Sequence, residues 1–177
     1  TIARRWEGEI RPHHFSGVAT VVTKLFGIVL PQVALFGQKD FQQSALVQQL
    51  VKDLNLGVEI IVHPTVREAD GLAMSSRNVY LSQEERKRAV TLYKGLRAGA
   101  EAIRRGVTDG EAIQSVMAHV LKKEPAITID YLAVCNPATL EPLSVVTSRV
   151  VLLGALRIGS VRLIDNLLVA LPRRSSK

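Results

Sequence analysis

Apolar residues recur at spacings of three and four along several stretches of the chain, which is the pattern of amphipathic α-helices. It predicts helices over residues 16–29, 41–54, 82–105 and 108–124. Ser16 and Asp40 are the expected N-caps of the first two helices, because their side-chain oxygens can accept from backbone N–H groups of the first turn. Capping boxes that begin at Ser82 and Thr108 open the other two.

Short apolar runs bounded by turn residues predict the strands. They lie over residues 33–36, 58–62, 127–134, 150–156 and 161–169. The run 33–36 is continuously apolar, so we expect it to be buried on both faces, as the strands of parallel sheets are. The last two strands are expected to form a hairpin, and the polar pair Asp165-Asn166 to mark a turn or an edge.

The order of these elements predicts two parts with different architectures. Helix, strand, helix, strand before residue 65 means a βαβ crossover, and therefore a parallel sheet and an open α/β fold. The helices and strands that follow predict a small α+β part. We therefore place one domain over residues 1–65 and a second over 66–177, joined through the segment 66–78.

Composition excludes several classes of protein. The chain has 177 residues, of which 47% are hydrophobic, enough to build a core. Its single cysteine, Cys135, excludes an internal disulfide framework and fits a reducing, cytoplasmic compartment. No His/Cys cluster has the spacing of a zinc site, so we expect no structural metal. The longest apolar run, 150–156, is far shorter than the roughly 20 residues of a spanning helix, so we expect a soluble protein.

A net charge of +7 indicates an anionic partner. The basic residues are dispersed: Arg86-Lys87-Arg88, Arg104-Arg105, Lys122-Lys123 and a tail with Arg173, Arg174 and Lys177. Aromatic residues make up 5% of the chain, and only Tyr93 lies among the basic clusters, so stacking platforms for bases are scarce. A solvated surface therefore explains these charges better than contact with nucleic acid.

The segment Gly37-Gln38-Lys39-Asp40 follows the first predicted strand, and ligands of open α/β folds bind at the carboxyl ends of strands. Gly37 permits close backbone approach, and Lys39 brings a cation to the start of a helix whose dipole favours phosphate. Asp40 can accept from a sugar hydroxyl, and Gln43, one turn further, can hydrogen-bond a second substrate. The alternative is a solvated lysine beside a capping aspartate.

A glycine-containing loop from Asp70 to Asn78 follows the second predicted strand. Hydroxyls of Ser75 and Ser76 and the guanidinium of Arg77 can together surround phosphate oxygens. The tetrapeptide alone also describes an ordinary solvated turn. Because it lies beyond the same sheet edge as residues 37–40, nucleotide binding is the favoured interpretation. A basic nucleic-acid-binding module and a structural dimerisation piece with a vestigial loop are the alternatives.

Four motifs closely resemble the pantothenate synthetase (pantoate–β-alanine ligase) family, and the resemblance covers nearly the whole chain. They are Arg11 to Phe15, Phe36 to Gln43, Val66 to Asn78, and Arg162 to Asn166, in one order and spacing. The resemblance implies the second half of a Rossmann-like parallel-sheet domain of the HIGH nucleotidyltransferase superfamily, followed by a small α+β C-terminal lid. It implies ATP-dependent adenylation of pantoate, with release of pyrophosphate, and then attack by the β-alanine amine to give pantothenate and AMP.

The resemblance also implies a role for each matching residue. Ribose and phosphate would contact Gly37, Gln38, Lys39 and Asp40; adenine would contact Val66 and Met74; the phosphates would contact Ser75, Ser76 and Arg77. Gln43 would bind pantoate. Lys39 and Arg77 would be catalytic, because charge grows on the α-phosphate and on the leaving pyrophosphate and preplaced cations stabilise it.

Two residues depart from the family pattern, and a large part of the family sequence has no counterpart. His13 stands where the family usually has Gly, and Gln38 where it has Glu. The His-Ile-Gly-His signature, a second pantoate-binding glutamine and the acidic Mg²⁺ ligands belong to a preceding segment of the family. We therefore expect a fragment that cannot complete catalysis alone, and, from the family, a cytoplasmic homodimer.

Overall fold

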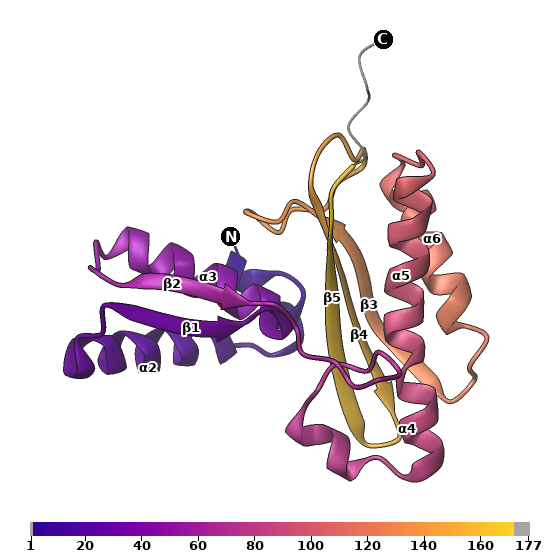
Figure 1. Cartoon of the computed structure of the whole chain (residues 1–177), viewed down its shortest axis with the longest axis horizontal. Helices are drawn as coiled ribbons and strands as arrows, with labels where there is room; N and C mark the ends of the chain where they lie inside the picture. Colours follow the sequence, from indigo (N-terminus) through magenta and orange to yellow (C-terminus); the bar gives the residue numbers. More distant parts are fainter. Residues whose placement is uncertain (1, 172–177) are drawn as a thin grey trace. The chain divides into compact units, whose positions relative to one another are not determined.

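A computed structural model describes residues 2–171 (Figure 1). The described chain folds as two compact units, residues 2–65 with 138–140 and residues 66–137 with 141–171. Thr1 and the basic tail that carries Arg173, Arg174 and Lys177 lie outside the described residues. No described helix combines the length and apolar character that crossing a membrane requires.

The first unit is a βαβ crossover preceded by helices. Its elements, with η for 3-10 helices, are η1 (Ile2–Arg4), α1 (Glu7–Ile10), α2 (His14–Val29), β1 (Val33–Gly37), η2 (Gln38–Asp40), α3 (Phe41–Asp53) and β2 (Glu59–His63). Strands β1 and β2 pair in parallel, from Val33 opposite Glu59 to Gly37 opposite His63. The predicted parallel sheet is therefore confirmed, and both strands end at the same edge.

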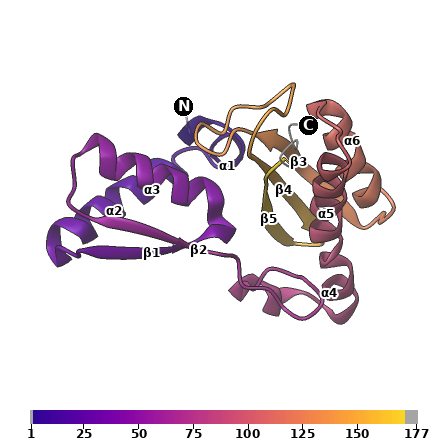
Figure 2. The ribbon, with the colours of Figure 1, turned by 45° about the horizontal axis from the view of Figure 1, so that its top comes forward.

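Helices α2 and α3 lie on the same side of the two strands, as Figure 2 shows. Val22 and Phe26 of α2 and Val47 of α3 are buried in one apolar cluster, with Ala34, Phe36 and Ile60 of the strands packed against it. The other face of the sheet is exposed, with Leu35 at 69% and Ile61 at 43% of full exposure. The prediction that residues 33–36 are buried on both faces is therefore wrong, because the described helices α2 and α3 cover one face and leave Leu35 on the other face exposed.

The start of α2 also differs from the prediction. The helix begins at His14, and the Ser16 hydroxyl donates to the His13 carbonyl at 2.7 Å, so Ser16 lies inside the first turn and is not the N-cap. His13 precedes the helix with a φ of +68°, in the left-handed region that favours glycine. His13 thus occupies a backbone conformation that a glycine would adopt more easily.

The second unit is an antiparallel sheet covered by helices. Its elements are η3 (Ser76–Tyr80), α4 (Gln83–Ala89), α5 (Thr91–Arg104), α6 (Gly110–Leu121), β3 (Ile127–Cys135), β4 (Val150–Ile158) and β5 (Val161–Val169). The strand order is β3-β4-β5, all antiparallel, which confirms the predicted hairpin between the last two strands. Together with the parallel first unit, this confirms the predicted sequence of an α/β part followed by an α+β part.

Helices α5 and α6 lie against the sheet and form the main core with it (Figure 1). Leu96 and Ile103 of α5, Met117 of α6, and Leu152 and Leu156 of β4 are fully buried there. The apolar spacing of three and four in both helices matches this single covered face.

Three local predictions in the second unit meet different outcomes. Ser82 forms the predicted capping box, since its hydroxyl accepts from Glu85 N at 3.3 Å and Glu85 accepts from Ser82 N at 2.8 Å. The predicted helix over 82–105 is divided into α4 and α5 at Val90. The box at Thr108 is wrong: Asp109 is the N-cap of α6 and accepts from Ala112 N at 2.8 Å.

Candidate functional site

The carboxyl ends of β1 and β2 form one edge of the parallel sheet, where Gly37 lies opposite His63. From Gly37 the chain enters η2, which contains Gln38, Lys39 and Asp40, and continues directly into α3. Four of the sequence-predicted nucleotide-binding residues thus share one turn at this edge. No atom of the described residues lies within 4 Å of the position where a Gly37 Cβ would be, so a ligand can approach its backbone closely.

Ser44, on the first turn of α3, holds this turn in shape. It is 3% exposed, and its hydroxyl lies 3.1 Å from the Gly37 carbonyl oxygen and 3.3 Å from that of Asp40. Asp40 occupies the N-cap position of α3, but its side chain makes no capping hydrogen bond among the described residues. Its carboxylate is exposed and available to a ligand hydroxyl.

The neighbouring glutamines Gln42 and Gln43 have different environments. Gln42 is 5% exposed; its Nε2 donates to the carbonyls of Ile2 and Arg5, and its Oε1 accepts from Glu7 N. It therefore fastens the N-terminal helices to α3. Gln43 is only half-buried, and within residues 2–171 no hydrogen bond of its amide is found. Of the two, Gln43 has the side chain that a substrate can use, which agrees with its predicted role.

The segment 66–74 is a tight hairpin in the second unit. Met74 N donates to the Val66 carbonyl at 3.0 Å, and Glu68 N donates to the Leu72 carbonyl at 2.9 Å. Arg67 forms an antiparallel bridge with Ala73 between these bonds. Val66 and Met74, the predicted adenine contacts, are therefore brought side by side, and each is 54% exposed.

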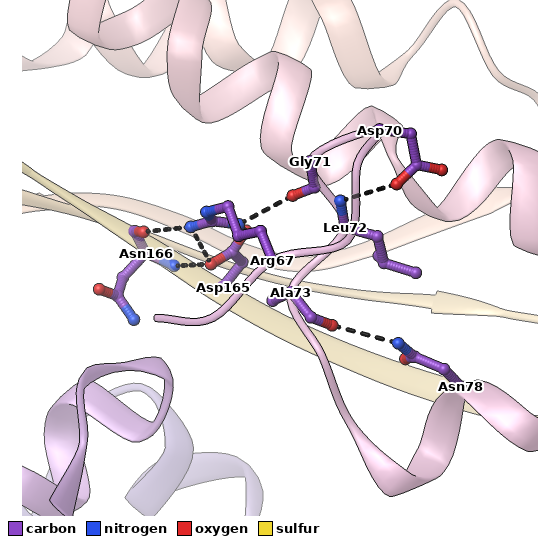
Figure 3. A network of polar contacts seen from close by, with 8 residues as sticks. All are labelled: Arg67, Asp70, Gly71, Leu72, Ala73, Asn78, Asp165 and Asn166. Atoms are coloured by element: carbon purple, nitrogen blue, oxygen red, sulfur yellow. Dashed lines mark hydrogen bonds and ion pairs between the residues drawn. The ribbon is translucent and has the colours of Figure 1, made fainter. Parts of the chain in front are cut away.

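The residues after Met74 form a short loop closed at its base. Arg77 N donates to Ser75 Oγ at 3.2 Å, and Asn78 N donates to the Ser75 carbonyl at 3.0 Å. The Asn78 amide Nδ2 then donates to the Ala73 carbonyl at 3.2 Å (Figure 3). Ala73 and Asn78 are thus tied together across the loop, and the loop of Met74, Ser75, Ser76 and Arg77 projects from that tie.

This loop, which we name the Ser-Ser-Arg loop (residues 74–77), presents polar groups to solvent. Ser76 and Arg77 are exposed, and in the part of the chain that the structure describes the Arg77 guanidinium has no ion pair. A guanidinium fork beside two hydroxyls and an apolar surface from Val66 and Met74 suits a ligand with phosphates at one end and a flat apolar ring at the other.

Several other basic side chains of the second unit are paired with acids. Arg86 binds Asp70 through two hydrogen bonds of 2.7 and 3.2 Å, and these bonds, helped by the Leu72 N–H, lower the pKa of the Asp70 carboxyl. Further pairs join Lys87 to Glu84, Arg88 to Glu124, and both Arg104 and Arg105 to Glu101. Each basic residue of the clusters 86–88 and 104–105 therefore has an acidic partner, although Arg104 and Arg105 share the single carboxylate of Glu101.

The structure thus brings the predicted residues together in two groups, one in each unit. Gly37, Gln38, Lys39, Asp40 and Gln43 form the first group. Val66, Met74, Ser75, Ser76 and Arg77 form the second. No group of three or more His, Cys, Asp or Glu side chains within residues 2–171 is arranged to hold a metal ion.

Sequence reasoning missed the residues that hold these groups in place. Ser44 was overlooked because a serine within a helix gives no local signal of a tertiary bond. Asn78 was treated as part of a turn, although its amide closes the Ser-Ser-Arg loop. Asp165 offered the clearest signal: a carboxylate in an apolar strand needs a buried partner. Of the two alternatives expected for Asp165-Asn166, the turn is wrong and the edge is confirmed, since both residues are buried within β5, an edge strand of its sheet.

Comparison with known proteins gives one consistent result. The family model described as Pantoate-beta-alanine ligase matches residues 1–168. The pantothenate synthetase of Herpetosiphon aurantiacus is 51% identical over 164 residues, covering 92% of this chain and 59% of that protein. That of Acetivibrio thermocellus is 53% identical over 162 residues, covering 92% and 58%. The chain therefore spans less than three fifths of the length of these curated relatives.

Solved structures agree with the sequence relatives. A pantothenate synthetase from Thermus thermophilus superposes with a TM-score of 0.91 at 47% identity, covering 94% of this chain and 60% of that one. A pantoate-beta-alanine ligase from Francisella tularensis, complexed with beta-gamma ATP and beta-alanine, superposes with a TM-score of 0.69 at 35% identity. It covers 94% of this chain and 55% of that one.

Proposed function

Because this chain belongs to the pantoate–β-alanine ligase family, we propose that it serves the ATP-dependent condensation of pantoate with β-alanine. The match of the family model over residues 1–168 is the observation that carries the proposal. In this reaction a pantoate carboxylate oxygen attacks the α-phosphorus of ATP, and pyrophosphate leaves. The β-alanine amine then attacks the acyl carbon of the adenylate, giving pantothenate and AMP.

The two groups of residues divide the contacts to ATP. Gly37, Gln38, Lys39 and Asp40 take the ribose and a phosphate, which the open backbone at Gly37 and the exposed Asp40 carboxylate support. Ser75, Ser76 and Arg77 take the phosphates, and Val66 with Met74 takes the adenine, which their 54% exposure supports.

Lys39 and Arg77 are the residues to which we assign catalysis. Negative charge increases on the phosphate oxygens as the α-phosphorus is attacked and pyrophosphate leaves. Cations that are already in place stabilise that charge more than they stabilise the ground state, so they raise the rate as well as the affinity. Gln43 binds pantoate through its amide, which is half-buried at the first turn of α3.

Within residues 2–171 no cluster of three or more acidic, histidine or cysteine side chains could by itself hold Mg²⁺. Carboxylate ligands for Mg²⁺ are expected from the part of the relatives that this chain does not span. A cytoplasmic location and a homodimer also belong to the proposal, and sedimentation of the purified chain tests the second. The nucleic-acid-binding alternative is not supported, because the family match points to the ligase and the basic clusters 86–88 and 104–105 are paired with acids.

The experiment uses a chimera. The part of the Acetivibrio thermocellus relative that this chain does not span is joined to this chain. Pantoate-dependent ATP–pyrophosphate exchange measures the first step, and AMP release with β-alanine measures the second. We expect both activities in the chimera. We expect no robust exchange from the 177-residue chain alone, and robust exchange there would show that these residues are sufficient.

Lys39→Ala in the chimera tests the role of the cation. We expect turnover to fall by about 100-fold or more, in the range seen when one preorganised electrostatic group is removed. Lys52→Ala is the matched control, because Lys52 is an exposed lysine in the last turn of α3, the helix that directly follows η2 and Lys39. Equal rates for the two variants would reject the catalytic assignment of Lys39.

A further inference from the structure

Arg67 is the most extensively bound side chain near the Ser-Ser-Arg loop. Its Nη1 donates to Asp165 Oδ2 at 2.6 Å, and its Nη2 donates to Asp165 Oδ1 at 2.9 Å, so the ion pair is bidentate. Nη1 also donates to the Gly71 carbonyl at 3.1 Å, and Nη2 lies 3.3 Å from the Asn166 carbonyl (Figure 3). One guanidinium therefore ties the hairpin 66–74 to strand β5.

Asp165 is a buried carboxylate in the middle of strand β5. Its side chain is 4% exposed, and its Oδ1 also accepts from Asn166 N at 2.7 Å. Burying a carboxylate is costly unless a cation compensates it, and a plain apolar residue would suit a strand of this core. The pair therefore contributes geometry that an apolar contact cannot, since a fork of two parallel bonds fixes both the position and the orientation of Arg67.

The ring of Tyr93 in α5 also contacts the Arg67 guanidinium. The Arg67 guanidinium carbon lies 3.9 Å from the centre of the Tyr93 ring, a cation–π contact. Gly71 meets the same ring, because a Cβ at Gly71 would lie 2.4 Å from Tyr93 Cδ1. Arg67 is thus held between a strand and a helix of one unit, and the tip of the hairpin is held with it.

The ion pair reaches the Ser-Ser-Arg loop through a short path. Arg67 is bridged to Ala73, which is the residue directly before Met74. The Ala73 carbonyl accepts from the Asn78 amide, which closes the far end of the loop. Ala73 is only 5% exposed, so it cannot shift without disturbing the core. The loop itself is exposed and has no comparable anchor of its own among the described residues.

We propose that the Arg67–Asp165 pair is a positioning pair that holds the Ser-Ser-Arg loop in the shape that binds the ATP phosphates. This inference rests on the proposed function and deepens it. Neither residue contacts ATP directly; each acts through Ala73 and Asn78. A misplacement of catalytic groups by about 1 Å can reduce a rate about 100-fold, so loosening this anchor has a large effect on phosphate contacts.

Asp165→Asn is the test variant and Asp130→Asn is its matched control. Asp130 of β3 pairs with Arg162 of β5, and the two side chains are 11% and 12% exposed, against 4% and 16% for Asp165 and Arg67. Asp130 also pairs with Arg157 of β4 at 3.1 Å. Both variants remove one carboxylate charge from a largely buried group of ion-paired side chains in the second unit and keep the shape of the residue. Of the two aspartates, Asp165 is the one bonded to the hairpin 66–74.

Hydrogen exchange followed by mass spectrometry on the 177-residue chain gives the first readout. We expect Asp165→Asn to increase the exchange rate of the amides in 72–78 by about 10-fold or more, while Asp130→Asn leaves them within about 2-fold of the unchanged chain. This arm requires no ATP, so it remains informative even where the proposed function fails. Equal exchange in both variants overturns the anchoring of the loop.

Nucleotide binding gives the second readout, measured in the chimera with ATP and with AMP. We expect Asp165→Asn to reduce the affinity for ATP about 10-fold more than the affinity for AMP, because the loop contacts the phosphates that AMP lacks. A purely structural role changes both affinities equally, and that result overturns the proposal. If the unsubstituted chimera does not bind ATP, the proposed function is refuted. The hydrogen-exchange result then still tests whether the pair anchors the loop.

Arg67→Lys is a second variant for the case in which Asp165→Asn does not fold. A lysine restores the charge opposite Asp165 but cannot form the fork or reach the Gly71 and Asn166 carbonyls at the same time. In the chimera, we expect Arg67→Lys to fold, with a kcat at least about 10-fold lower and a higher KM for ATP. Wild-type kinetics in Arg67→Lys overturn the positioning role.

Discussion

Gly71→Ala is expected to destabilise the second unit by more than its backbone conformation alone predicts. Gly71 has a φ of +98°, and a Cβ placed there would lie 2.4 Å from Tyr93 Cδ1 and 2.7 Å from Tyr93 Cε1. Gly106 follows α5 with a nearly equal φ of +94°, but within residues 2–171 no atom lies within 4 Å of its Cβ position. Gly106→Ala therefore measures the backbone cost by itself.

The magnitude has two parts. A left-handed conformation costs an alanine about 1–2 kcal/mol, and this part is shared by both variants. The smaller freedom of an unfolded alanine offsets it by about 0.4–1 kcal/mol, again equally. At Gly71 the Tyr93 ring must also move, which weakens a cation–π contact with Arg67 worth about 0.5–2 kcal/mol. We therefore expect Gly71→Ala to be less stable than Gly106→Ala by about 1–2 kcal/mol.

Urea unfolding followed by far-UV circular dichroism measures the free energies of unfolding of both variants. Both glycines belong to the second unit, so the two substitutions report on the same folded part. Equal free energies within about 0.5 kcal/mol would refute the reasoning, because the contact with Tyr93 would then carry no cost. A Gly71→Ala variant more stable than Gly106→Ala would refute it more strongly.

The remaining predictions concern one strained residue and one ion pair. His13→Gly is expected to raise the thermal midpoint, since a glycine adopts the φ of +68° about 1 kcal/mol more easily; a lowered midpoint contradicts this. Arg86 and the Leu72 N–H lower the pKa of Asp70 below its usual 3.8, so the charged pair stabilises the fold above that pH. The stability advantage of the unchanged chain over Asp70→Asn should disappear as the pH falls below 3.8, measured by urea unfolding from neutral pH downward. A difference in the free energy of unfolding that stays constant over this pH range would contradict the prediction.

The elements and their order could be predicted because they depend on local spacing. Strand β5 has the predicted bounds, and the parallel pairing of β1 with β2 follows from the intervening helix. Helix starts were less predictable. Ser16 and Thr108 were plausible N-caps by residue type, yet His13 and Asp109 occupy the N-cap positions. The backbone angles that decide which residue is the cap do not follow from residue type alone.

The resemblance drawn from four motifs is confirmed by the family model over residues 1–168. The roles assigned to individual residues remain predictions. The structure adds a distinction that the sequence lacks: Gln42 is committed to the carbonyls of Ile2 and Arg5, whereas Gln43 is not. Both are glutamines at the start of one helix, so only the direction of each side chain separates a structural role from a binding one.

The sequence by itself determined the fold class, the family, and the residues of the Ser-Ser-Arg loop, because periodicity and contiguous motifs are properties of neighbouring positions. Only the tertiary structure decided what holds that loop. Arg67 and Asp165 are separated by 98 positions in the chain, and their pairing follows from β5 lying beside the hairpin 66–74. In the sequence, a long-range ion pair appears only as two charged residues far apart. Its distance, burial and bidentate geometry exist only in the folded unit.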